Sequence, residues 1–472
     1  MPEFASDVSA ASFGDVRLTR RLQSIVSALS AKPNIGFPMA VGNAAACEGF
    51  YRFLRNTKVT SDAILKPYVE SSFARCGSLR EVLVLHDTTQ FQFGGHGERE
   101  GLGTTGGPTK GFFGHFALAV DPGSGNEPLG VLGLKTFSRV KKKYSRATRA
   151  AYLRRLRRDP TKESLRWGDL VEDVESKLSE KTAAIHVMDR ESDSYVLLSR
   201  MAAIQARYVI RVTAKRKLFP LGPDDPVALE YENWEDLPDL LEREVALSRR
   251  TKIGRVPPGR HPARRQRIAK LRFSAKRVRA KRCSNIPISF PASLELNAVR
   301  VYEVDVPRGE EPVEWLLLTS EPIKTPRDVA RVVDIYRARW TIEEYFKALK
   351  TGCAFEKRQL ESFKTLSNAL AILIPIACKI LLLRNLERQP NSTRTSDLVS
   401  QTQLDVLREF SSRPPPARAT PGTVLSAIAA LGGHLRNNGP PGWQVLWRGY
   451  EELLVMERAW IAVLRRQRSD QS

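Results

Sequence analysis

The stretch Glu81-Val-Leu-Val-Leu-His-Asp87 has the composition of a buried β-strand and ends on a carboxylate. A second stretch further along the chain, Ala183-Ala-Ile-His-Val-Met-Asp189, repeats this pattern. Short apolar runs of this kind are typical of strands that are covered on both faces. Amphipathic segments at residues 167–178 and 194–206 favour helices on either side of the second run. The order of strands and helices therefore predicts an α/β layer in which two strands end in aspartates.

A third carboxylate lies in a predicted helix at residues 327–350, which includes Tyr336-Arg-Ala-Arg-Trp-Thr-Ile-Glu-Glu-Tyr-Phe-Lys-Ala-Leu-Lys350. Good helix formers dominate this stretch, and no Gly or Pro interrupts it before Gly352. Successive helical residues turn by about 100°, so one arc of roughly 60° carries four functional side chains. They are Tyr336, Arg339, Glu343 and Lys350. From the spacing alone, a solvated face with helical ion pairs remains an alternative.

Carboxylates from two strands and one helix can converge at one edge of a sheet. Asp87, Asp189 and Glu343 would raise one another's pKa if they met there without a counter-charge. Divalent cations remove this conflict, and Mg²⁺ prefers oxygen ligands. Two such ions about 3.5–4 Å apart can activate an attacking oxygen and stabilise the leaving oxygen of a phosphodiester. Taken alone, either aspartate at its strand end could instead cap a turn.

The overall composition favours a polyanionic partner. The 472 residues include 75 Lys and Arg against 52 Asp and Glu, a formal net charge of +23. Such an excess favours nucleic acid, with an anionic membrane surface as the competing interpretation. No membrane span is expected, because the apolar run at residues 369–383 is interrupted by Pro375 and Lys379 and is typical of a buried helix.

The cysteines and the N-terminal composition indicate the cytoplasm. Five scattered cysteines form no Cys-x-x-Cys pair, which suits a reducing compartment without disulfides or a zinc site. The N-terminus lacks a signal-peptide pattern, because Asp7 and Asp15 fall where an apolar segment would be needed.

Composition divides the chain into four predicted regions. Residues 1–70 are predicted to be helical. Residues 71–213 and 314–390 carry the α/β layer, residues 214–313 form a β-rich basic insertion, and residues 391–472 are again helical. Two strips, at residues 139–158 and 249–282, are rich in Arg and Lys and contain no Asp or Glu. We expect them to contact phosphates rather than bases, although a solvated surface remains an alternative.

Several of these motifs together resemble one family. Asp87-Thr-Thr89, Asp189-Arg-Glu-Ser-Asp193 and the spacing in residues 336–350 resemble the Tn-five-type transposases of the insertion-sequence-four group, which are DDE transposases. Residues 49–56 and 314–322 resemble further family segments, and the region around Trp443 and Trp447 resembles another one more weakly. The resemblance implies a ribonuclease-H-like catalytic domain interrupted by the insertion. It also implies an N-terminal DNA-binding domain and a C-terminal dimerisation domain.

The resemblance also assigns roles to individual residues. Asp87, Asp189 and Glu343 would be catalytic and would ligate Mg²⁺ or Mn²⁺, as two ions. DNA contacts would come from five residues: Tyr336, Arg339, Lys350 and Arg211 on phosphates, and Trp315 stacked on a flipped base. From its residues alone, Trp315 could equally be a core tryptophan.

The reaction implied is cut-and-paste transposition. Its steps are nicking, attack by the freed 3′-OH to form a hairpin, hairpin opening, and strand transfer to target DNA. The implied partners are transposon ends, target DNA and a second copy of the chain, in the nucleoid of a bacterial cytoplasm. Two rival hypotheses stay open: a metal-dependent nuclease of the same fold without strand transfer, and an inactive end-binding regulator.

Some neighbouring polar residues are expected to stay outside the site. Glu344 points about 100° away from Glu343 on a helix, which predicts a surface or salt-bridge residue. Glu191 and Asp193 are expected to pair locally with Arg190, with an accessory role in the site as the alternative. His86 and His115 are expected to be structural rather than metal ligands.

Overall fold

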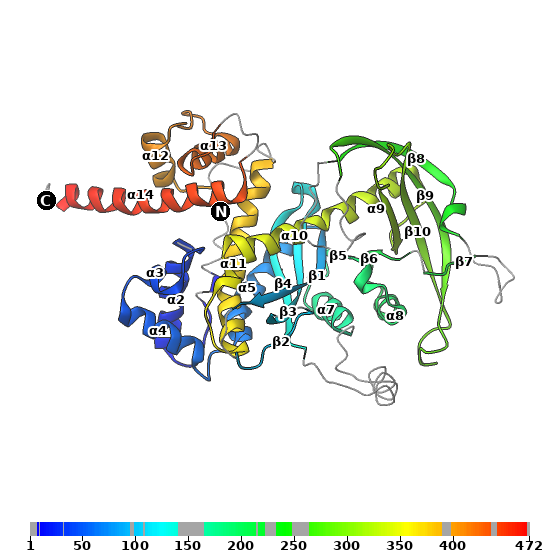
Figure 1. Cartoon of the computed structure of the whole chain (residues 1–472), viewed down its shortest axis with the longest axis horizontal. Helices are drawn as coiled ribbons and strands as arrows, with labels where there is room; N and C mark the ends of the chain where they lie inside the picture. The colour runs from blue at the N-terminus through cyan, green and yellow to red at the C-terminus, as the bar shows by residue number, and fades with distance from the viewer. Residues whose placement is uncertain are drawn as a thin grey trace.

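One mixed sheet runs through the computed structural model, with helices on both faces (Figure 1). The structure describes residues 7–8, 10–31, 33–94, 99–106, 109–139, 165–213, 216–221, 233–247, 264–388, 398–435 and 441–469. Within them, eleven strands share the sheet. The α/β class predicted from the sequence is therefore confirmed.

The central strands bring the two predicted aspartates to one edge. Their order is β4 (Glu127–Phe137), β3 (Lys110–Asp121), β1 (Glu81–Phe93), β5 (Ala183–Met188) and β6 (Arg207–Arg211). β1, β5 and β6 are parallel, whereas β3 and β4 are antiparallel to their neighbours. Leu85 lies opposite Val187 in the register of β1 and β5. Asp87 and Asp189 each follow two residues later, so both emerge at the same edge.

The remaining strands extend the same sheet beyond β6. β11 (Glu314–Thr319) pairs with β6, followed by β10 (Ser293–Val304), β9 (Arg267–Lys281) and the short β7 (Phe219–Pro220). β8 (Asp239–Leu247) pairs with β9, and β2 (Gly103–Thr104) pairs with β3 at the other end. The region at residues 214–313 is thus rich in β-structure, and its strands add to the sheet instead of forming a second one. The domain limits drawn from composition remain a prediction.

The alternation of side chains along β1 explains why both faces are covered. Leu83 and Leu85 face the core formed with α9 (Pro326–Ala338), α10 (Trp340–Lys347) and α11 (Phe363–Arg388). Val82 and Val84 face the opposite core, which includes side chains of α7 (Arg166–Glu175). A further helix, α8 (Tyr195–Ala203), packs with β5 and β6 on this second side. Successive strand residues point to opposite faces, so an unbroken apolar run feeds two cores at once.

The predicted continuous helix at residues 327–350 is wrong in one respect, because the α-helix is interrupted at Arg339. α9 ends at Ala338 and α10 begins at Trp340. The Arg339 N–H donates to Tyr336 O at 3.1 Å and the Ile342 N–H donates to Arg339 O at 3.1 Å, a tighter turn than an α-helix makes. A π-helical turn, η5 (Ala348–Gly352), then ends the segment. Local propensity favours a straight helix, but the side chain of Arg339 is held by groups on another element.

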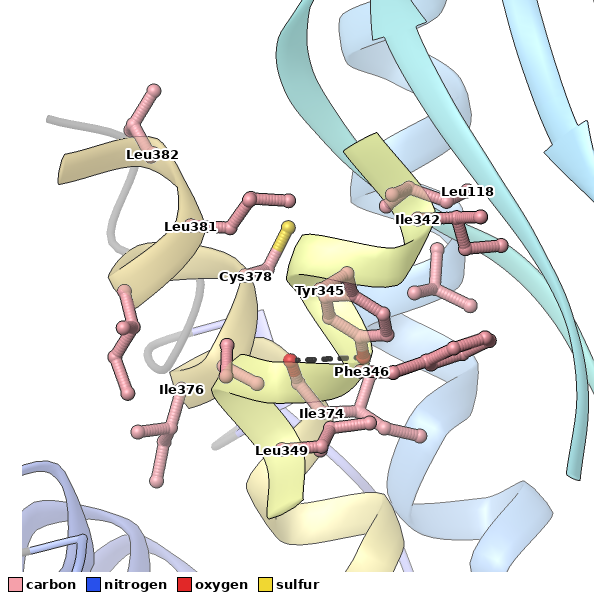
Figure 2. Close-up of a cluster of buried hydrophobic side chains, with 14 of the residues drawn as sticks. Leu118, Ile342, Tyr345, Phe346, Leu349, Ile374, Ile376, Cys378, Leu381 and Leu382 are labelled. Carbon is pink, nitrogen blue, oxygen red and sulfur yellow. Dashed lines mark hydrogen bonds between the residues drawn. The ribbon is translucent and has the colours of Figure 1, made fainter. Parts of the chain in front are cut away.

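α11 is buried over most of its length, as the sequence predicted for residues 369–383. Its segment Phe363–Asn385 is the stretch of the described chain that is long and apolar enough to cross a membrane, and 94% of its most apolar window is buried inside the protein. Figure 2 shows side chains of α10 and η5, among them Tyr345 and Leu349, packed against those of α11. The Tyr345 hydroxyl donates to Ile374 O at 3.4 Å, just before Pro375. The helix that carries Glu343 is thereby wedged between the sheet and α11.

Helices form both ends of the chain, as predicted. The N-terminal set is α2 (Val16–Ala31), α3 (Phe37–Val41), α4 (Ala44–Arg55) and α5 (Ser61–Cys76), and the C-terminal set is α12 (Gln401–Phe410), α13 (Pro421–Leu431) and α14 (Trp443–Ser469). α2 to α4 and α12 to α14 lie at the end of the sheet opposite to β8, β9 and β10 (Figure 1). The side chain of Asn43 caps α4 by accepting from Ala46 N at 2.8 Å, which explains where that helix begins.

A ring of four charges closes the sheet edge opposite to the aspartates. Arg207 bonds Glu81 at 3.0 Å and Glu321 at 2.6 Å. Arg331 of α9 bonds the same two carboxylates at 2.5 Å and 2.7 Å. The ring therefore joins the starts of β1 and β6 to the end of β11 and to α9.

Candidate active site

Asp87 occupies a buried position at the centre of the sheet edge. Its side chain lies on β1, and the residue is 7% exposed. One carboxylate oxygen accepts from the Thr88 N–H at 2.7 Å, and the other accepts from the guanidinium of Arg339 at 2.9 Å. The backbone of its own strand and a helix 252 residues away thus fix the orientation of this carboxylate.

Arg339 joins two of the three predicted carboxylates. Its second terminal nitrogen donates to Glu343 at 3.2 Å, one helical turn further along. The guanidinium is 13% exposed, whereas the Glu343 side chain is 37% exposed and reaches toward solvent. Burial lowers the pKa of Arg339, but Asp87, Tyr336 and Glu343 outweigh it and hold that pKa above its usual range. This arginine is a permanent cation between Asp87 and Glu343.

The three carboxylates are close enough to repel one another. Burial raises the pKa of Asp87 to about 7, with Arg339 opposing the shift and Asp189 and Glu343 adding to it. Asp189 follows β5, where its side chain accepts from the Glu191 N–H at 2.9 Å. The structure therefore brings Asp87, Asp189 and Glu343 toward one edge, where Arg339 supplies positive charge to Asp87 and Glu343.

The donor set fits a hard divalent cation. Carboxylate oxygens are the ligands that Mg²⁺ prefers, and the raised pKa of Asp87 is the strain that a cation relieves. Among the described residues, no three His, Cys, Asp or Glu side chains are already arranged to hold a metal ion. Two of the candidate carboxylates are instead engaged by Arg339. The metal-ligand roles of Asp87, Asp189 and Glu343 therefore stay a prediction, which the chemistry of the donors supports.

Three of the predicted DNA contacts gather beside this cluster. Trp315 at the start of β11 meets the Tyr336 ring edge-on, with ring centroids 5.3 Å apart. Arg211 at the end of β6 donates to Glu314 O at 3.2 Å. Burial raises the pKa of Tyr336, whereas Arg339 and Arg211 oppose that rise. Two cations and two aromatic rings thus stand next to the carboxylates, although Trp315 is also half-buried against the core.

Lys350 borders the cluster on another side. It lies in the π-helical turn that follows α10, and its ammonium is 5.6 Å from the centre of the Phe91 ring. Burial lowers its pKa, while Glu356, Glu343 and Asp87 oppose that shift. π-helical turns are frequent at functional sites, because they displace side chains from the regular helical positions. Here the turn lies where Lys350 comes near two of the predicted catalytic carboxylates.

The structure corrects two expectations about neighbouring residues. Glu344 is 8% exposed, so the surface position, one of its two expected alternatives, is wrong, because α10 is packed between the sheet and α11. Its salt-bridge alternative stays a prediction. Asp193 pairs with Arg216, not with Arg190, because Arg216 follows β6 and lies close by in space. Both corrections come from residues that are distant along the sequence but close in space.

The histidines lie behind the site, as expected of structural residues. His86 Nε2 and His186 Nδ1 are 2.8 Å apart, and His186 Nε2 is 2.9 Å from Glu175. His115 Nδ1 is 2.9 Å from the hydroxyl of Thr88. Burial lowers the pKa of His115 to about 3 and that of His86 well below its usual value, so both are neutral at pH 7.

The described part of the basic insertion is largely neutralised by its own carboxylates. Arg267 bonds Glu303 at 2.9 Å and Glu310 at 2.7 Å, and Arg272 bonds Glu242 at 2.9 Å. Residues 249–263 of the predicted strip, and residues 140–158 of the other one, lie outside the described residues. The arginines of β9 face carboxylates from β8, β10 and the loop after β10. The absence of acids within the strip itself did not predict these partners.

Comparison with known families shows to which family the chain that carries this site belongs. The chain matches the transposase DDE domain family over residues 83–378, more than half of its length. The chain belongs to the DDE-domain transposases. This family consists of enzymes that act on DNA, and its matched region includes Asp87, Asp189 and Glu343.

The N-terminal helices match a second transposase family. Residues 3–59 correspond to the transposase DNA-binding domain, a range that includes α2, α3 and α4. This match supports the expected DNA-binding character of the N-terminal region, while the limits of that domain at residues 1–70 stay a prediction. Among solved structures, the chain is similar to the piggyBac transposase in a synaptic complex with hairpin DNA, with 11% sequence identity and a TM-score of 0.32. That match covers 82% of this chain and 66% of the piggyBac chain, slightly less than two thirds.

Sequence reasoning missed residues that lie outside this DDE transposase site and fix the segments that form it. Glu356 accepts from the Gln92 N–H of β1 at 2.8 Å. Arg358, buried at 3% exposure, fixes the segment after Lys350. No local pattern distinguishes these residues from ordinary surface polar groups, because each acts on a segment that is remote in sequence.

Proposed function

We propose that this protein is a cut-and-paste DNA transposase of the Tn-five type, in the insertion-sequence-four group. The observation that carries the proposal is the guanidinium of Arg339, which bonds Asp87 of β1 and Glu343 of α10. The family motif spacing predicts that these three side chains meet. An acidic cluster bordered by Arg211, Arg339 and Lys350 suits the cutting of a polyanion.

We further propose that the catalytic part is ribonuclease-H-like. The order β4-β3-β1-β5-β6, with three parallel strands followed outward by two antiparallel ones, supports this description. In this proposal residues 71–213 and 314–390 form the catalytic domain, and residues 214–313 are the insertion. Residues 1–70 bind DNA and residues 391–472 contribute dimer contacts.

Asp87, Asp189 and Glu343 are the proposed holders of two Mg²⁺ ions, with Mn²⁺ as a substitute. When bound, such ions would activate the attacking oxygen and stabilise the leaving oxygen of a phosphodiester. Thr88 and Arg339 keep Asp87 in one orientation before any ion arrives. The half-exposed Glu343 is the most adjustable member of the set.

The basic and aromatic side chains around the carboxylates are proposed to hold the DNA. Arg339, Arg211 and Lys350 would bind phosphates, with the Tyr336 hydroxyl as a further donor. Trp315 would stack on a base flipped out of a hairpin end, which offsets part of the cost of unstacking that base. The chain would work as a homodimer on two transposon ends and a target duplex, in the bacterial nucleoid.

Replacing Lys350 with alanine is expected to weaken DNA-end binding and to flatten its salt dependence. If Lys350 neutralises one phosphate, the slope of log K against log salt becomes about one unit less steep. Fluorescence anisotropy of a labelled duplex end at several salt concentrations measures both quantities. Lys177→Ala, which removes a half-exposed lysine paired with Asp173 on α7, is the matched control and should leave the slope unchanged. Equal slopes for wild type and Lys350→Ala would exclude the phosphate contact.

The products formed from a labelled DNA end separate this function from its rivals. A duplex that carries the element's own terminal repeat is incubated with the protein and Mg²⁺, with and without a target plasmid. Hairpin ends and integrated products support a transposase. Simple nicks without integration support a nuclease, and binding without any cut supports an inactive regulator.

A further inference from the structure

One partly buried segment ties the carboxylate edge to the DNA-binding helices. It runs from Cys353 to Asn368, directly after the turn that carries Lys350, and is called the bracket here. It contains the short helix η6 (Phe355–Lys357) and the first residues of α11. The bracket therefore follows the helix of Glu343 and passes against the N-terminal unit.

Arg358 locks the bracket onto the loop between α2 and α3. The residue is 3% exposed, and its guanidinium donates to the carbonyls of Pro33 and Ile35 and, at 2.6 Å, to Cys353 O. The guanidinium carbon also lies 4.4 Å from the centre of the Phe37 ring at the start of α3. Breaking these contacts would leave buried polar groups unsatisfied, so the lock resists opening.

A second set of contacts holds the end of α4. Asn368, 1% exposed, donates to Leu54 O at 3.0 Å and to Val59 O at 3.1 Å. Lys364 donates to Asn56 O at 2.9 Å. The last turn of α4 and the chain that follows it are thereby capped by α11 instead of by water.

The other side of the bracket is bonded to the catalytic sheet. Glu356 accepts from the Gln92 N–H of β1, the strand that carries Asp87, at 2.8 Å. The backbone of Glu100 bonds Glu361 O and Phe363 N, both at 2.8 Å. The same short segment thus forms hydrogen bonds with the loop between α2 and α3, with the end of α4 and with β1.

We propose that the bracket is a ruler that fixes how far from its recognised sequence the enzyme cuts DNA, with Arg358 and Asn368 as positioning residues. This inference rests on the proposed function. Neighbouring phosphates along a duplex are separated by about 3.4 Å of helix axis, so small tilts of the DNA-binding helices would present a different phosphate to the carboxylates. In a dimer, the carboxylates of one subunit could act on the DNA end that the partner subunit binds. The bracket would then still fix the DNA-binding helices relative to the rest of the same subunit, and the dimer contacts would fix that subunit relative to its partner.

The wild-type protein tests the ruler through the position of its cut. Duplex ends that carry the element's terminal repeat are prepared with one or two base pairs inserted between the recognised sequence and the natural junction. The cut is expected to keep its distance from the recognised sequence and to move off the junction. A cut that stays at the junction in every duplex would overturn the ruler while leaving the transposase function intact. Absence of any cut would remove the proposed function and the ruler with it.

Removing contacts of the bracket should make the position of cleavage less precise. Arg358→Ala is expected to spread cleavage over adjacent phosphodiesters and to slow cutting at the normal one by about tenfold to a hundredfold, the cost of a misplacement of about 1 Å. Asn368→Ala loses two hydrogen bonds but no charge, and carries the same expectation should Arg358→Ala fail to fold. Arg408→Ala, which removes an arginine paired with Asp405 on α12, is the control and should cut at one position. A single unshifted cut by folded Arg358→Ala and Asn368→Ala would overturn the proposal.

Discussion

Glu343→Gln is expected to reduce DNA strand cleavage by about a thousandfold or more, since a metal-assisted step contributes several kcal/mol and each 1.36 kcal/mol is a factor of ten. The change keeps the size of the side chain and removes only its charge. Arg339 retains its bond to Asp87, so the fold around the site should persist. DNA-end binding should be unchanged or slightly tighter, because one negative charge beside the phosphates is lost.

A gel assay of cleavage and an anisotropy assay of binding check the two halves of this expectation. Glu344→Gln is the matched control, because the residue is adjacent on α10 and receives the same substitution. It should cleave at nearly the wild-type rate, provided that its thermal unfolding is also unchanged. Cleavage lost in Glu344→Gln but kept in Glu343→Gln would show that the wrong carboxylate has been assigned.

Glu321→Ala is expected to lower the free energy of unfolding by about 3 kcal/mol, the effect of breaking a buried ion pair on one side. The Glu321 side chain is 2% exposed and bonds both Arg207 and Arg331. Its loss leaves these two arginines with Glu81 as their remaining partner in the ring. Urea denaturation followed by tryptophan fluorescence measures the change. Glu242→Ala, which breaks an exposed pair with Arg272, should cost much less. Equal losses in both variants would contradict the importance of the ring.

The same carboxylate predicts a pH dependence of stability. Burial raises the pKa of Glu321, but Arg207 and Arg331 outweigh burial and hold it below the usual value of 4.5. The unfolded state therefore binds more protons in this range, and stability rises with pH. The contribution is fully present above pH 4.5 and is lost as pH falls through the folded-state pKa. Stability measured from pH 6 downward should thus fall less steeply in Glu321→Ala than in wild type below pH 4.5.

The strands and their aspartates could be predicted because their signals are local. The apolar runs before Asp87 and Asp189 each became a strand, and the parallel register placed both ends together. β1 continues to Phe93, beyond the carboxylate. The buried helix around Pro375 was predictable for the same reason, since its apolar length outweighs one proline.

Contacts between distant segments could not be predicted. The helix is interrupted at Arg339, whose side chain bonds Asp87 on β1, and nothing within residues 336–350 contains that contact. Glu344 is buried because α11 covers α10, and Asp193 pairs with Arg216 because β6 ends beside it. No sequence pattern pointed to Arg358. This residue nevertheless joins the region that matches the DDE domain to Pro33 and Ile35 in the region that matches the DNA-binding domain.

The central claim is that Asp87, Asp189 and Glu343 act together to cut DNA with divalent ions. The most direct measurement is hairpin formation on a labelled duplex that carries the element's own terminal repeat, followed over a series of Mg²⁺ concentrations. We expect nicked and then hairpin products from the wild type, only in the presence of Mg²⁺ or Mn²⁺, and none from Asp87→Asn, Asp189→Asn or Glu343→Gln. A wild-type protein that binds this duplex yet leaves it uncut at every concentration of either ion would contradict the account.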